Sequence, residues 1–468
     1  MNVQEKIFAL GFNRNQREVD RTLLYEGNGI PHWLNGSFIR NGPGLFYCGE
    51  KRFNHWFDGL AMLHKFDFDH GKVYYQSKFL ECESSKQALH SDTLTYSEFA
   101  TDPCWSIFGR LRSMYKHGPT DSAKVNLARV GDKYFALGET TMQIQFDPET
   151  LQSVGKYNFK MPKFGTSSTA HPHIENNEAC NLVIKYGPIN KYQILKMDSS
   201  VTKLASVDTF TPCYMHSFGM SKKYFVIAET PYTVQSLNLL LVNRPFIENF
   251  KWDKNRGTRL WIIDRKSGKT VLKKEIPPFF YFHFVNCFDI EEGLVFDMIT
   301  YENADIIESY YLDNIYNKEL SIPGGKLTRF EVDLGSKSVD SFTLCDVGME
   351  LPTIDYDRYN MNPGYRYVYA MSLNKGSHSF YDQLIKVDTC SKTYVTWFQD
   401  GCFPGEPIFI PRPQSHGEDD GILMSLVIDT REDCSFLLIL DAVDLSEISR
   451  VQTPAPILAG FHCNYFKN

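Results

Sequence analysis

The sequence predicts an all-β fold of the barrel or propeller kind, from three observations. Aromatic residues make up 14% of the 468 residues, and aromatic side chains favour strands. Short apolar runs recur along the chain with turn signals between them. Long amphipathic helical patterns are scarce, which argues against folds that alternate strands and helices. No linker or low-complexity tract divides the chain, so residues 1–468 are predicted to form a single domain.

Individual strands can be placed from short apolar runs at 134–137, 224–228 and 259–264. Many short strands joined by tight turns favour a barrel or a propeller. No WD or kelch repeat is present, so the residue pattern alone does not choose between the two. The turn signals pair glycine with polar residues and lie at 69–72, 131–133, 266–269 and 291–293.

Composition and charge exclude several classes of partner. The chain carries 49 Lys and Arg against 56 Asp and Glu, a net charge of −7, and has no long basic run, which argues against nucleic acid. Neither Gly-rich nucleotide motif occurs, so no nucleotide cofactor is expected. Eleven scattered cysteines without a C-x-x-C pair indicate reduced thiols. Charged residues run through 1–21 and no bilayer-length apolar stretch follows, which predicts a cytoplasmic protein, at most peripheral to a membrane.

Two segments interrupt the strand-like texture. Residues 104–116 mix bulky apolar side chains with three cations, and residues 234–252 combine a leucine-rich run with Phe and Trp. Each could lie in a membrane interface, with its apolar side among the headgroups and its cations nearby. An ordinary helix packed on the core explains either segment as well, and taken singly it is the simpler interpretation.

Four of the thirteen histidines share similar surroundings. His171, His216, His283 and His462 lie beside small, aromatic or apolar residues. An imidazole in such surroundings needs a partner for each ring nitrogen, either a hydrogen-bonding group or a metal. Their wide separation gives no local ligand pattern, and spacing alone favours four unrelated histidines over a shared metal.

Three glutamates are also embedded between small or apolar residues: Glu139, Glu350 and Glu406. A buried carboxylate is costly unless it is paired. Accepting the N–H of a metal-bound imidazole would be one such pairing. Taken singly, each glutamate is more simply a turn residue.

A series of short motifs resembles the carotenoid cleavage oxygenases, especially their animal members. The motifs run in the family's order from about residue 28 to residue 463. They are GSFIRNGPG at 36–44, FNHWFDGL at 53–60, DPC at 102–104, AHPHIE at 170–175, MHSFG at 215–219, FHFVN at 282–286, EPIF at 406–409 and EDDG at 418–421.

The resemblance implies a seven-bladed β-propeller capped by helices and loops, with iron(II) on its axis. It implies His171, His216, His283 and His462 as the ligands. The outer carboxylates would be Glu139 for His216, Glu350 for His283 and Glu406 for His462. Cys104 would be a possible acylation site, and the two apolar segments would contact a membrane surface. The sequence departs from the family pattern in a shorter 301–350 region and in Cys463, where a glycine commonly follows the last ligand.

The implied activity is an O2-dependent dioxygenase that cleaves a carotenoid double bond to aldehydes, with central 15,15' cleavage of β-carotene to retinal as the leading expectation. Four neutral imidazoles leave iron(II) its full charge and positions for dioxygen, whereas zinc would have no redox role. Retinoid isomerohydrolase activity and eccentric carotenoid cleavage stay open within the same fold. A non-catalytic, membrane-associated carotenoid-binding protein is the alternative of another class. The aromatic surplus predicts a substrate tunnel with Phe282, Phe284 and Phe461 beside the ligands.

Overall fold

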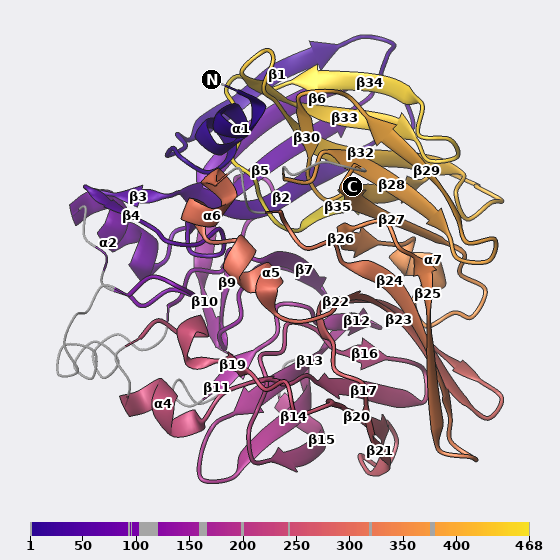
Figure 1. Cartoon of the computed structure of the whole chain (residues 1–468). Helices are drawn as coiled ribbons and strands as arrows, with labels where there is room; N and C mark the ends of the chain where they lie inside the picture. The colour runs from indigo at the N-terminus through magenta and orange to yellow at the C-terminus, as the bar shows by residue number, and fades with distance from the viewer. Residues whose placement is uncertain are drawn as a thin grey trace.

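Seven antiparallel sheets form the blades of a β-propeller in the computed structural model, as the sequence motifs predicted (Figure 1). Each sheet has four or five strands, and the inner strands of several neighbouring blades contact one another around the centre. The short strands predicted at 134–137, 224–228 and 259–264 are confirmed as parts of blade strands. The structure describes residues 2–91, 94, 96–102, 120–158, 166–197, 201–241, 244–317, 321–374 and 380–467.

The first blade joins the two ends of the chain. Its strand order is β1-β6-β5-β2-β35, so the final strand pairs antiparallel with β2 near the start. Figure 1 shows the indigo and purple strands of this blade beside the yellow strands of the last blade. This pairing closes the ring. The strands are β1 (Val19–Glu26), β2 (Gly36–Leu45), β5 (Leu60–Asp69), β6 (Lys72–Phe79) and β35 (Cys463–Lys467).

Blades two to four follow in chain order, each built from adjacent hairpins. The predicted turns at 131–133 and 266–269 lie between paired strands. Their glycines adopt the positive φ angles that these tight turns require. Blade two contains β7 (Asn126–Val130), β8 (Lys133–Leu137), β9 (Met142–Phe146) and β10 (Ser153–Asn158). Blade three contains β11 (Thr166–Ser168), β12 (His173–Glu175), β13 (Glu178–Lys185), β14 (Asn190–Met197) and β15 (Val201–Thr209). Blade four contains β16 (Gly219–Met220), β17 (Tyr224–Glu229), β20 (Thr258–Asp264) and β21 (Thr270–Ile276).

Blades five to seven become more exposed toward their outer strands. The middle strand β32 (Gly421–Asp429) is buried along its whole length, whereas β29 (Thr393–Phe398) is almost entirely exposed. Blade five contains β22 (Phe280–Ile290), β23 (Gly293–Tyr301), β24 (Lys326–Asp333) and β25 (Ser338–Cys345). Blade six contains β26 (Met349–Thr353), β27 (Tyr367–Ser372), β28 (Gln383–Asp388) and β29. Blade seven contains β30 (Cys402–Pro404), β31 (Ile408–Pro411), β32, β33 (Cys434–Asp441) and β34 (Glu447–Gln452).

Short helices and loops between the strands contribute to the central core. The loop at 53–58 is fixed to the α5–α6 segment, because Trp56 N donates to Tyr310 O and Leu312 N donates to Asn54 O. The helices are α1 (Val3–Gly11), α2 (Glu83–Ser91), α4 (Ser236–Leu241), α5 (Asp305–Ser309), α6 (Leu312–Tyr316) and α7 (Tyr356–Tyr359), with a 3-10 turn η1 (Ile247–Asn249). Two small hairpins complete the fold: β3 (Tyr47–Cys48) with β4 (Lys51–Arg52), and β18 (Tyr232–Thr233) with β19 (Lys251–Trp252).

The structure describes only one of the two apolar segments at 104–116 and 234–252 in any part. Residues 103–119, which hold Cys104 and the whole of the 104–116 segment, lie outside the described residues. Within 234–252 the structure forms α4, η1 and β19, and Phe250 and Ile247 are buried in the core. None of the helices in the described ranges is long and apolar enough to span a bilayer.

Candidate metal centre and cavity

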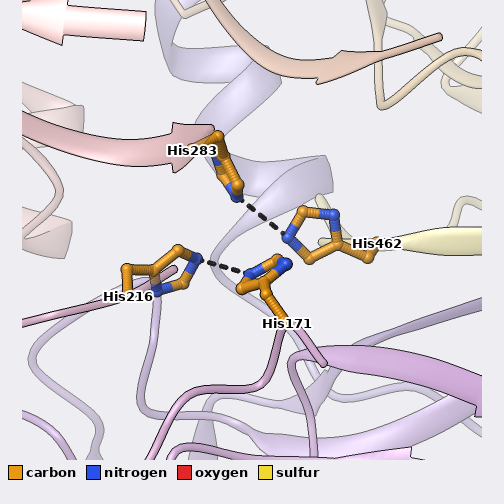
Figure 2. A group of neighbouring side chains, drawn as sticks. All are labelled: His171, His216, His283 and His462. Carbon is orange, nitrogen blue, oxygen red and sulfur yellow. Dashed lines mark hydrogen bonds between the residues drawn. The ribbon is translucent and has the colours of Figure 1, made fainter. Parts of the chain in front are cut away.

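Four histidines from four blades converge at the centre of the propeller. His171 lies between β11 and β12, His216 precedes β16, His283 lies within β22 and His462 precedes β35. One nitrogen from each ring lies within 4.8 Å of the corresponding nitrogens of the other three. Figure 2 shows the rings directed toward a common point. Spacing in the sequence did not group these residues, whereas the inner strands of four blades bring them together around the axis.

Three of the four rings are held by carboxylates. The Nδ1 atom of His216 lies 2.6 Å from Glu139 Oε1, that of His283 lies 2.6 Å from Glu350 Oε2, and that of His462 lies 2.7 Å from Glu406 Oε1. These are the pairs that the resemblance implied. Glu350 and Glu406 come from the blade next to that of their histidine, whereas Glu139, in the turn between β8 and β9 of blade two, reaches His216 at the start of blade four.

The carboxylates are themselves held by donors that sequence reasoning missed. The hydroxyl of Tyr214 donates to Glu139 at 2.7 Å, and the hydroxyl of Tyr301 donates to Glu350 at 2.9 Å. The backbone N–H of Cys463 donates to Glu406 at 2.7 Å. Tyr214 lies two residues before His216, but nothing in the sequence indicates its carboxylate partner. These contacts restrict the orientation of each glutamate and therefore of the imidazole that it holds.

The hydrogen bonds assign the nitrogens that face the centre. An imidazole that donates from Nδ1 to a carboxylate leaves a lone pair on Nε2. The Nε2 atoms of His283 and His462 are 3.2 Å apart, so two lone pairs face each other there. Burial lowers the pKa of His283 to about 4, which keeps this imidazole neutral at physiological pH. A cation between the rings would satisfy both lone pairs.

His171 is held differently from the other three rings. Its Nδ1 atom lies 3.3 Å from the side-chain amide nitrogen of Asn126, and its Nε2 atom lies 2.9 Å from the Nε2 atom of His216. Burial, followed by the charges of the neighbouring histidines, lowers the pKa of His171 well below its usual range. His171 is therefore a neutral ring that none of the described carboxylates contacts. Asn126, at the start of β7, carries no sequence signal that predicts this contact.

The donor set fits a divalent transition metal. Two ligands on opposite sides of an ion at about 2.1 Å would be about 4.2 Å apart, which is compatible with the 4.8 Å limit on the nitrogen separations. Imidazole suits iron, copper, zinc and nickel. The three outer carboxylates offset the charge of such an ion without occupying its coordination positions.

A cavity of about 800 Å³ reaches three of the four histidines. Its wall near them is aromatic, and the loop at 53–58 and Tyr310, the residue after α5, contribute to it. Of the predicted rings, Phe282 and Phe461 line this cavity. A cavity of this size and character suits a large apolar ligand. The aromatic side chains around the histidines are Trp56, Phe57, Phe99, Phe282, Tyr310 and Phe461.

Phe284 does not line this cavity. It lines a separate cavity of about 280 Å³ that reaches His171, His283 and His462, and it packs against Tyr281 and Phe296. The pairing of β22 with β23 is irregular on both sides of Phe284. In a regular strand Phe282 and Phe284 would share a face, so this irregularity separates the two side chains.

Comparisons with known proteins agree with this architecture. The family model described as "Retinal pigment epithelial membrane protein" matches residues 12–467. A carotenoid isomerooxygenase of Galleria mellonella is 32% identical over 91% of this chain and 90% of its own length. The β,β-carotene 15,15'-dioxygenase of Mus musculus is 31% identical over 96% of this chain and 90% of its own.

Solved structures show the same fold. A mutant of Synechocystis apocarotenoid oxygenase has a TM-score of 0.88 at 23% identity, covering 100% of this chain and 99% of its own. A cobalt-substituted form of the Synechocystis protein has a TM-score of 0.87 at 24% identity, covering 99% of both chains.

Proposed function

Because the chain belongs to the retinal pigment epithelial membrane protein family, which includes the carotenoid oxygenases, we propose that it is an iron(II)-dependent carotenoid cleavage dioxygenase. The reaction would join one O2 to one carbon–carbon double bond and give two aldehydes. The specific reaction that we propose is central 15,15' cleavage of β-carotene to retinal, which is the activity named for the Mus musculus relative. The observation that carries this proposal is the convergence of four imidazoles at an apolar cavity of about 800 Å³.

The residues around the cavity have separable roles in this proposal. His171, His216, His283 and His462 would hold iron(II), which supplies the redox chemistry with dioxygen when bound. The carboxylates of Glu139, Glu350 and Glu406 keep Nδ1 protonated on their histidines, so that Nε2 presents its lone pair. The aromatic wall orients a rigid polyene and excludes water from it. The polyene supplies the electrons, so the reaction balances without another reductant.

A second candidate is cleavage coupled to double-bond isomerisation. The Galleria mellonella relative, at 32% identity, is named a carotenoid isomerooxygenase. The same ring of histidines and the same cavity serve either reaction. The two differ in the geometry of the products, since isomerisation yields a cis retinoid alongside the all-trans aldehyde.

The first prediction concerns the products of the iron-loaded protein. Incubation with β-carotene under labelled dioxygen is expected to give retinal that carries the label, detected by mass spectrometry after chromatography. An apocarotenal and a retinyl ester serve as parallel substrates. Conversion of the ester alone would indicate a retinoid isomerohydrolase, and fragments of unequal length would indicate eccentric cleavage. Intact pigment bound in the presence of iron and oxygen would indicate a carrier and refute the enzymatic proposal.

We also propose that the mouth of the cavity lies on a membrane surface. Phe210 is 93% exposed and Leu237, in α4, is 68% exposed, and both line the cavity. Apolar side chains at a tunnel mouth would let a lipid-soluble substrate pass from the bilayer with little contact with water.

The Phe210→Asp/Leu237→Asp double variant is expected to lose most binding to liposomes in a co-sedimentation assay. Two carboxylates would be costly to insert among the headgroups. Phe398→Asp is the control, because Phe398 is exposed on the outer strand β29. Equal sedimentation of the double variant and the wild-type protein would contradict the proposed membrane contact.

A further inference from the structure

A buried ion pair lies in the wall of the cavity. Lys124 and Glu98 are 5% and 3% exposed, and both line the cavity. The ammonium group of Lys124 contacts the Glu98 carboxylate and donates to the backbone oxygen of Asp58 at 2.7 Å. Burying two charges costs hydration that their mutual attraction does not generally exceed. Fold stability therefore gives no sufficient reason for this pair.

Lys386 is a second buried lysine, and it serves for comparison because it does not line the cavity. It is also 5% exposed, and it donates to the Asp419 carboxylate at 2.6 Å and to the backbone oxygen of Val443 at 2.7 Å. Its remaining side is covered by the ring of Tyr367, with the ammonium nitrogen 4.2 Å from the ring centroid. Lys386 therefore has a carboxylate, a carbonyl and a π face around its charge.

Lys124 has a carboxylate and a backbone carbonyl around its charge, as Lys386 does, but it differs in the third partner. Within the described part of the chain it contacts Glu98 and Asp58, and no aromatic ring covers it. An ammonium group has three N–H donors, so one donor has no acceptor among the described residues. Because Lys124 lines the cavity, a ligand there can supply the missing acceptor.

Ser122 provides a second, independent indication at the same place. It is buried and lines the cavity, and its hydroxyl has no hydrogen-bond partner among the described residues. Thr120, beside it, donates its hydroxyl to Glu98 at 2.7 Å. We call Glu98, Thr120, Ser122 and Lys124 the polar patch. Two of its four side chains have hydrogen-bonding capacity that the described protein leaves unused, which is unfavourable in a buried setting.

We propose that the polar patch binds a neutral oxygen atom at one end of the substrate, so that carotenoids with a terminal hydroxyl or carbonyl group bind more tightly than β-carotene, which stays a substrate of the same reaction. This inference rests on the proposed function, because it assumes that a carotenoid occupies the cavity. Lys124 donates to the ligand oxygen, and the Ser122 hydroxyl, which is buried in the wall, bonds to the same atom when its side chain turns toward the cavity. A carboxylate ligand fits less well, since Glu98 already neutralises Lys124 and the ligand would add an unpaired negative charge.

The test compares zeaxanthin with β-carotene, because the two differ only by the ring hydroxyls. Binding to the metal-loaded protein is measured under argon, which prevents turnover, by quenching of tryptophan fluorescence in one detergent. Lys124→Met is expected to lower the preference for zeaxanthin, expressed as a ratio of dissociation constants, by about tenfold relative to the wild-type protein, as loss of a hydrogen bond from a charged donor does. Differences in micelle partitioning between the two ligands cancel when the ratio is compared across variants.

Lys386→Met is the matched control and is expected to leave the ratio unchanged. Glu98→Gln/Lys124→Met removes both charges together and replaces the single variant if that variant does not fold. Ser122→Ala is expected to shift the ratio in the same direction by a smaller factor. An unchanged ratio in these patch variants, or an equal shift in Lys386→Met, would overturn the inference.

The cleavage reaction and the role of the polar patch are tested by different measurements. Retinal formation from β-carotene combined with an unchanged binding ratio would leave the proposed reaction standing and refute the role of the polar patch. A ratio that depends on Lys124 in a protein that forms no cleavage product would support the patch and refute the reaction. The binding ratio does not depend on turnover.

Discussion

Replacing His216 with alanine is expected to abolish metal binding and carotenoid cleavage together. The substitution removes one of four imidazoles and leaves the carboxylate of Glu139 without its ring. Mutating a group that hydrogen-bonds to a metal-ligating histidine typically lowers metal affinity or activity about 10- to 100-fold. Removing the ligand itself should cost at least as much. We therefore expect cleavage of β-carotene to fall at least about 100-fold. Metal content by mass spectrometry and retinal formation by chromatography would be measured on the same preparation.

His173→Ala is the matched control for this experiment. His173 is two residues from His171, but its ring nitrogens lie 3.0 Å from the Phe218 carbonyl oxygen and 3.0 Å from the Tyr356 hydroxyl. Both ring nitrogens of His173 therefore have partners outside the four-histidine centre. The control variant is expected to retain its metal. Full metal content and full activity in His216→Ala would refute the assignment of the ligands.

Replacing Trp56 with alanine is expected to lower the free energy of unfolding much more than replacing an exposed aromatic residue does. Trp56 is buried where separate parts of the chain meet, and its ring contacts Phe12, Phe380 and Phe461. Its indole N–H donates to the Ala459 carbonyl oxygen at 3.0 Å. Truncation of a buried aromatic side chain to alanine costs about 3–5 kcal/mol. The loss should appear as a lower denaturant midpoint and a lower melting temperature.

Phe398→Ala provides the comparison for the stability measurement. Phe398 is 46% exposed on β29, and surface substitutions usually change stability by no more than about 0.5 kcal/mol. Its midpoint should stay close to that of the wild-type protein. If Trp56→Ala behaved like Phe398→Ala, the aromatic cluster would not be the contact that joins these parts of the chain.

The strands of this fold were more readily predicted than its closure. Apolar runs and glycine-containing turns are local signals, and they located β8, β17 and β20. The pairing of β35 with β2 joins residues from opposite ends of the chain, and no local pattern encodes such a contact. The blades also lack a recognisable sequence repeat, so the seven-bladed architecture followed from family motifs.

The candidate site could be predicted only in part, for a related reason. His171, His216, His283 and His462 come from four blades, so their sequence spacing carries no ligand pattern, and motif resemblance identified them. Asn126, Ser122 and Lys124 gave no signal, because their contacts depend on neighbouring blades and on the cavity wall. Phe284 was assigned to the wrong cavity because an irregularity in β22 changed the alternation of its side chains.

The closing strand sets the order in which the centre can be completed during synthesis. His462 is the last of the four histidines to leave the ribosome, and the strand that follows it, β35, completes the first blade. A nascent chain therefore holds three of the imidazoles before the ring of blades can close. Metal loading into the full set is a late event in biogenesis, and chains that stop before residue 462 lack ring closure and the fourth imidazole together.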